Sequence, residues 1–155
     1  MAALLQLSLP RLQSGQSAPV AGAGWRLLVV YKASCPTCRV LLPLISRFFD
    51  LSAGKADLAL VSQDSAADSA GLVSELGLAM PVFLDAPAFR LSKALGCVSV
   101  PMMVELSVER LVAVTEGLNK IELGAMLGRF GDSRQVAAAA RAVLADPCLP
   151  EYKPG

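Results

Sequence analysis

The sequence predicts one α/β domain in three layers, with helices on both faces of a mixed β-sheet. The chain has 155 residues, the size of a single domain, and 54% of them are hydrophobic against 17% charged. Short apolar runs alternate with helical patterns, which is typical of strands joined by helices. The last two predicted strands are close enough in sequence to form a hairpin, so the sheet is expected to be mixed rather than purely parallel.

Several segments in the first part of the chain have the sequence pattern of β-strands. Apolar runs rich in β-branched or aromatic residues predict buried strands at residues 26–31, 58–61 and 82–84. Residues 4–9 alternate loosely between apolar and polar and are expected to form an edge strand that Pro10 ends. Residues 14–24 are rich in Gly, Ser, Pro and Ala, and are expected to form a loop.

Helical patterns separate these strands and continue beyond them. Apolar residues at helical spacing predict helices directly after Cys35 and at residues 66–76, 88–95, 120–130 and 135–145. Residues 102–106 and 110–115 are expected to form two antiparallel strands joined by a tight turn. We expect residues 1–131 to form the domain, and residues 132–155 to add a helix and a proline-rich tail that packs on it or frays.

Several classes of function are excluded by composition. The chain has no histidine, which excludes Ser-His-Asp and Cys-His catalysis and metal sites with histidine ligands. A net charge of +1 with no basic run argues against nucleic acid as a partner. No stretch reaches the length of about 18 apolar residues that a membrane span needs, and the first ten residues lack the basic start of an export signal. We therefore expect a cytoplasmic protein whose thiols stay reduced.

Two of the four cysteines stand close together in Cys35-Pro36-Thr37-Cys38, where a predicted buried strand is followed by a helix. Pro36 suits the first helical position, which makes Cys35 the N-cap and Cys38 the third helical residue. Residues three apart on a helix bring their Cβ atoms to about 5–6 Å, a separation that a disulfide bridges with little backbone movement.

The helix start also suggests roles for the two thiols. Its unpaired N–H groups and the positive end of its dipole favour an anion at Cys35, whose thiolate is therefore expected to be the more populated. Lys32, three residues upstream, adds to this effect if its ammonium reaches the sulfur. We expect Cys35 to attack a substrate disulfide, and the more buried Cys38 to resolve the product.

Two structural alternatives stay open for the pair. A C-x-x-C motif can be half of a zinc site, but no second C-x-x-C and no histidine supply the other ligands, so no metal is expected. The two cysteines can also form an inert buried pair. A redox pair is favoured, because close cysteines in a reducing compartment are more often reactive than structural.

The strand and helix around the motif resemble the active-site segment of thioredoxin-like proteins. The similar stretch runs from Leu27 to Leu44 and includes Pro43, which matches the proline inside the family's active-site helix. The segment Ser99-Val100-Pro101-Met102 resembles the loop in which the family's cis-proline faces the disulfide, and Gly117 matches the glycine before the terminal helix. The resemblance covers about residues 4–130.

The layout is most similar to TlpA-like or redoxin-type oxidoreductases. A further strand and helix between residues 66 and 95 resemble the insertion of TlpA-like proteins and peroxiredoxins. The resemblance implies a thioredoxin-like fold with this insertion between the active-site helix and the cis-proline strand, followed by an extra C-terminal helix and tail. It implies no cofactor other than the Cys35–Cys38 disulfide itself.

The resemblance implies a thiol–disulfide oxidoreductase that exchanges with protein or small-molecule disulfides through a mixed disulfide at Cys35. Its partners are then a disulfide or small-thiol substrate and a redox partner such as a reductase. Val100 and Pro101 are the implied substrate-binding residues, with a cis bond between them and the backbone of Val100 paired to an extended substrate. The residues expected to support the site are Lys32, Ser34, Pro36 and Thr37.

Two other functions are the alternatives. Peroxiredoxins set a threonine three residues before the reactive cysteine, whereas Lys32 holds that place before Cys35. The other alternative is a thioredoxin-fold binding module without turnover. The chain also departs from thioredoxin itself, which has tryptophan at the place of Ser34 and a buried acid at the place of Val29.

The two remaining cysteines, Cys97 and Cys148, are candidate auxiliary thiols. Cys97 lies four residues before Pro101 and is expected to be a small buried hydrophobic residue. Cys148 lies in the proline-rich tail, where an extended and solvated path is expected, so we expect an exposed thiol.

Overall fold

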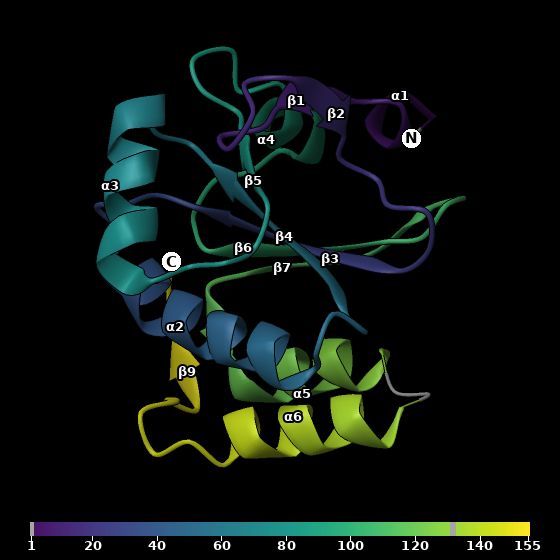
Figure 1. Ribbon diagram of the computed structural model, residues 1–155, viewed down its shortest axis with the longest axis vertical. Coiled ribbons are helices and arrows are strands. Elements are labelled where there is room, and N and C mark those ends of the chain that lie inside the picture. The colour runs from purple at the N-terminus through teal and green to yellow at the C-terminus, as the bar shows by residue number, and fades with distance from the viewer. Residues whose placement is uncertain (1, 131–132) are drawn as a thin grey trace.

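A five-stranded sheet forms the centre of the computed structural model, which describes residues 2–130 and 133–155. Its strands are β3 (Arg26–Tyr31), β4 (Asp57–Ser62), β5 (Val82–Leu84), β6 (Met102–Leu106) and β7 (Leu111–Glu116). Their order across the sheet is β5-β4-β3-β6-β7 (Figure 1). The central strand β3 pairs in parallel with β4 and antiparallel with β6, so the sheet is mixed, as predicted.

Each face of the sheet carries its own hydrophobic core. Side chains alternate along β3: Leu27, Val29 and Tyr31 face one core, and Leu28 and Val30 face the other. The first core is packed by helices α2 (Pro36–Leu51), α3 (Ala66–Leu76), α5 (Lys120–Gly128) and α6 (Arg134–Leu144). The second is covered by α1 (Ala2–Leu5), α4 (Arg90–Leu95), β1 (Ser8–Pro10) and β2 (Ser17–Pro19) (Figure 1). The predicted three-layer α/β fold class is confirmed.

Capping residues explain where several helices begin and end. The hydroxyls of Ser65 and Ser133 accept hydrogen bonds from backbone N–H groups in the first turns of α3 and α6. Gly77 and Gly96 end α3 and α4 with φ angles of 63° and 64°, in the left-handed conformation that favours glycine. Both helices therefore end at the predicted residues, 76 and 95.

The start of the chain differs from the prediction. Residues 4–9 are not one edge strand, because α1 ends at Leu5 and β1 begins at Ser8. Leu4 and Leu7 lie three residues apart, the spacing of a helical turn, and both are buried in the second core. β1 pairs with β2, which lies in the segment that was expected to be a loop.

The end of the chain packs against the domain. α6 buries one apolar face, formed by Val136, Ala139, Ala140 and Val143, in the first core. Beyond it, β8 (Leu118–Asn119) and β9 (Tyr152–Lys153) pair antiparallel. The expected division between residues 131 and 132 lies outside the described residues. Within residues 2–130 and 133–155, no helix is both long and apolar enough to cross a membrane.

Candidate active site

The two neighbouring cysteines lie at the N-terminal end of α2, directly after the central strand. Cys35 is the N-cap residue, with φ −81° and ψ 116°, and its Sγ accepts a hydrogen bond from the N–H of Cys38 at 3.2 Å. Pro36 occupies the first helical position and Cys38 the third. Because this sulfur partners one of the N–H groups that a helix start leaves unpaired, capping holds the Cys35 thiol beside Cys38.

The two thiols differ in their environment. Cys35 is half-buried, whereas Cys38 is fully buried in the first core. Burial raises the pKa of the Cys38 thiol, and its hydrogen bond with Cys35 and the charge of Asp64 act in the same direction. Cys38 is therefore a neutral thiol in the reduced protein, while Cys35 is accessible to a reaction partner.

The loop before β6 faces these thiols. The Val100–Pro101 peptide bond is cis, and the Cys35 thiol donates a hydrogen bond to the Val100 carbonyl oxygen at 3.3 Å. Pro101 is buried, and its carbonyl oxygen accepts the N–H of Gly117 at 2.8 Å. The two residues that the resemblance implies for substrate binding thus lie beside Cys35.

The expected supporting residues take different positions. Lys32 is exposed and contributes its carbonyl oxygen, which accepts the N–H of Cys35 at 3.1 Å; among the described residues its ammonium makes no hydrogen bond or ion pair. Ser34 and Pro36 are also exposed. Thr37 is only 4% exposed, and its hydroxyl donates to the carbonyl oxygen of Pro154 at 2.6 Å, a contact between residues far apart in sequence.

Three further residues position the turn before Cys35, and the sequence reading missed them. The N–H of Ala33 donates to the Asp64 carboxylate at 2.7 Å. The carbonyl oxygen of Ala33 accepts from Arg39 Nε at 2.8 Å, and Arg39 pairs with Glu75 at 2.7 Å. The one available signal is topological, because Asp64 follows β4 and the carboxyl ends of parallel neighbours meet at one edge. A pocket of about 490 Å³ lies between these side chains and Ser34.

Cys97 and Cys148 lie in different surroundings. Cys97 is half-buried; its Sγ donates to the Ser99 carbonyl oxygen at 3.4 Å, and burial raises its pKa, with the charge of Glu116 adding to the effect. Cys148 is exposed and lines an apolar groove of about 410 Å³ along α2. In the part of the chain that the structure describes, no three or more Cys, Asp or Glu residues are grouped as metal ligands would be.

Alkylation of the reduced protein is expected to follow the exposure of the four thiols. With iodoacetamide at pH 7, Cys35 should react at least about tenfold faster than Cys38, because thiolate access controls the rate and the Cys38 thiol is both buried and neutral. Cys148 should also react readily, and Cys97 slowly. Mass spectrometry of the labelled peptides over time measures each rate. Equal rates for Cys35 and Cys38 would contradict their assigned roles.

The reduced protein is expected to lose stability as the pH rises above about 8.5, the pKa of an unfolded cysteine. Folding raises the pKa of Cys38, so above this pH the unfolded chain releases a proton that the folded chain keeps. Between pH 8 and 9.5 this amounts to about 1 kcal/mol of unfolding free energy. Urea unfolding of the reduced protein and of Cys38→Ala at several pH values measures how each free energy of unfolding changes with pH, and the loss between pH 8 and 9.5 should be smaller in Cys38→Ala. A pH dependence that is equal in the two proteins would refute the assignment.

No protein-family model matches this sequence, and no curated protein sequence is similar to it. Solved structures are similar in fold. A secreted Mycobacterium tuberculosis disulfide oxidoreductase homologous to E. coli DsbE has a TM-score of 0.69 and 16% identity, covering 89% of this chain and 99% of its own. M. tuberculosis DsbF has a TM-score of 0.68 and 18% identity, covering 88% and 97%. Peroxiredoxin Q of Xanthomonas campestris has a TM-score of 0.66 and 21% identity, covering 94% and 91%. Together with the mixed sheet and the cysteine pair at the start of α2, these similarities show that the chain has the thioredoxin-like fold.

Proposed function

We propose that the protein is a thiol–disulfide oxidoreductase that exchanges with protein and small-molecule disulfides. The observation that carries the proposal is the asymmetry of the cysteine pair: an accessible Cys35 caps α2, and a buried Cys38 lies in hydrogen-bond contact with it. An attacking thiol needs access and stabilisation of its thiolate, whereas a resolving thiol needs only to reach the first sulfur.

The exchange proceeds in two steps. The thiolate of Cys35 attacks one sulfur of a substrate disulfide, which forms a mixed disulfide and releases the first substrate thiolate. Cys38 then gives its proton to water or to the released substrate thiolate and attacks the Cys35 sulfur, which forms the Cys35–Cys38 disulfide and releases the second substrate thiolate. The substrate gains two electrons. A reductase or a small dithiol then returns two electrons and two protons to the pair.

The elements of the site divide these tasks. The N-terminal end of α2 holds the Cys35 sulfur in place through the hydrogen bond that the N–H of Cys38 donates to it. The high pKa of Cys38 keeps it from attacking before the mixed disulfide has formed.

We propose that the protein acts in the cytoplasm, although the M. tuberculosis oxidoreductase of similar fold is described as secreted. The redox poise of the compartment sets the direction of the exchange.

A thiol peroxidase is the second candidate, favoured by the similarity to peroxiredoxin Q over 94% of the chain. Insulin reduction with dithiothreitol as the electron donor, set beside hydrogen peroxide consumption, tests both. Turnover of insulin that depends on Cys35 supports the oxidoreductase. Peroxide consumption without insulin reduction would establish the peroxidase instead. If both activities are absent, a thioredoxin-fold binding module without turnover is the remaining candidate.

A further inference from the structure

The segment Glu151–Gly155, called the tail below, lies beside the candidate active site instead of extending into solvent. In β9, Tyr152 pairs with Asn119 and Lys153 with Leu118. The N–H of Lys120 donates to the Glu151 carbonyl oxygen at 3.0 Å. Figure 1 shows the yellow tail passing from β9 to the end of the chain beside the start of α2.

The last residues of this segment contact the groups that surround Cys35. The Pro154 carbonyl oxygen accepts the Thr37 hydroxyl from within the Cys-Pro-Thr-Cys motif. Gly155 packs against the cis-proline loop so closely that a Cβ atom there would lie 2.6 Å from the Val100 carbonyl oxygen and 2.9 Å from Ser99 Oγ. Gly117, whose N–H donates to the Pro101 carbonyl oxygen, has a φ of 73°, and a Cβ atom there would lie 3.0 Å from the Lys153 carbonyl oxygen. The tail thus packs closely on Gly117 and on the Val100 loop beside the active site, and this line of contact is called the groove below.

This groove is also the place where an extended substrate would lie. Under the proposed function, such a substrate runs beside Cys35 and pairs with the backbone of Val100, as extended peptides pair with exposed backbone elsewhere. Gly155 already occupies the space at the Val100 carbonyl oxygen. A protein disulfide and the docked tail therefore cannot fill the groove together.

We propose that residues 151–155 are an intramolecular occupant of the peptide-substrate groove, which an extended protein disulfide must displace and a small disulfide need not. The inference rests on the proposed function and adds its substrate selection. The groove takes extended backbone with a small residue against Val100, since Gly155 leaves no room there for a side chain.

The attachment of the tail is suited to opening. Leu149 is buried in the first core and anchors the base of the segment. Beyond it the ladder is only two residues long, Tyr152 is 63% exposed, and the Lys120–Glu151 ion pair lies at the surface. Short ladders and surface ion pairs contribute little stability. Displacement thus separates the last residues without unfolding the domain.

Hydrogen exchange tests this displacement directly. The full-length Cys38→Ser variant lacks the resolving thiol and retains a mixed disulfide at Cys35. Two adducts are compared, one with a cysteine-containing peptide and one with 2-mercaptoethanol. The readout is the Lys120 amide, whose hydrogen-bond acceptor belongs to the tail.

The peptide adduct should lose at least about tenfold in protection of the Lys120 amide, while the mercaptoethanol adduct keeps the protection of the free protein. Equal protection in the two adducts would overturn the inference. If neither adduct forms, the proposed function fails instead. Protection of the β3 amides shows whether Cys38→Ser is folded. If these amides are unprotected, Cys38→Ala is used in place of Cys38→Ser.

A matched pair of glycine substitutions tests the same inference through rates. Gly155→Val sets a side chain against the Val100 carbonyl oxygen and forces the end of the tail out, whereas Gly24→Val makes the same change where nothing lies within 4 Å. Gly155→Val should raise kcat/KM for insulin about fivefold and leave that for 2-hydroxyethyl disulfide unchanged, because only the extended substrate competes with the tail. Gly24→Val should change neither. The inference would be overturned if Gly155→Val loses protection of the Lys120 amide while the ratio of kcat/KM for insulin to kcat/KM for 2-hydroxyethyl disulfide stays unchanged.

Discussion

Replacing Cys35 with serine is expected to reduce disulfide exchange to the background rate. A hydroxyl does not form the nucleophile at neutral pH that a thiol does, and Cys38 is too buried to take over the attack. The serine oxygen can still cap α2, so the fold should persist. Insulin reduction measures the loss, and circular dichroism checks the fold. A folded variant with a tenth or more of the wild-type rate would contradict the role of Cys35.

Replacing Cys38 with serine should instead stop the exchange after its first step. The first step remains possible, so Cys38→Ser should accumulate a mixed disulfide at Cys35 that mass spectrometry detects, with no further turnover. Cys148→Ser is the matched control, since its thiol is exposed on the groove along α2. We expect it to keep the wild-type rate. A loss of turnover in Cys148→Ser with Cys35 still reactive would instead make Cys148 part of the electron path.

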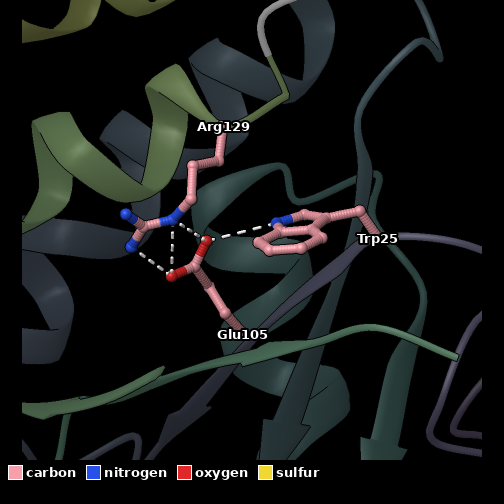
Figure 2. Close-up of polar contacts among 3 residues, drawn as sticks. All are labelled: Trp25, Glu105 and Arg129. Carbon is pink, nitrogen blue, oxygen red and sulfur yellow. Dashed lines mark hydrogen bonds and ion pairs between the residues drawn. The ribbon is translucent and has the colours of Figure 1, made fainter. Parts of the chain in front are cut away.

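The second large effect concerns stability and lies at the other end of the sheet. Figure 2 shows the carboxylate of Glu105 held between Arg129 and Trp25. Glu105 is 0% exposed; it accepts hydrogen bonds from Arg129 Nε at 2.8 Å and from Trp25 Nε1 at 3.2 Å. The same ion pair raises the pKa of the Arg129 guanidinium. A buried carboxylate is tolerated when its oxygens are paired in this way.

Arg129→Met is therefore expected to lower the free energy of unfolding by about 3 kcal/mol, the lower end of the range for breaking a buried pair. The lower end applies because Arg129 is itself 42% exposed. The double variant Glu105→Leu, Arg129→Met should recover most of the loss, since it removes the unpaired charge as well. Urea unfolding at pH 7 measures all three proteins.

The exposed ion pair of Arg47 with Asp146, at 2.9 Å, is the matched control. Arg47→Met should cost less than about 1 kcal/mol, as is usual for surface pairs. If Arg129→Met costs no more than Arg47→Met, the buried pair does not stabilise the fold in the way that its burial indicates.

The chemistry of the cysteine pair could be predicted because its parts are neighbours in sequence. Strand, N-cap, Pro36 and helix follow one another directly, so local rules place Cys35 at the helix start and Cys38 one turn inside. The continuous apolar run of β3 likewise indicates a sheet that is buried on both faces.

The rest of the site could not be read in this way. Asp64 reaches Ala33 only because β4 pairs in parallel with β3, and Pro154 reaches Thr37 only because α6 returns the chain along α2. Such contacts depend on tertiary packing and leave no periodic pattern. For the same reason the sequence left open whether the tail packs or frays: its prolines favour an extended path, and only the fold shows that β8 offers an edge on which that path can dock.

The position of Trp25 gives the protein an internal optical reporter. It is the single tryptophan of the chain, and it lies with Glu105 at the end of β3 opposite to the cysteines. The six residues of β3 advance about 3.3 Å each, which sets the indole about 20 Å from Cys35. Disulfides quench indole emission only near contact, so the fluorescence should be the same in the oxidised and the reduced protein. Emission will therefore follow unfolding alone, and the stability of the two redox states can be compared with one signal.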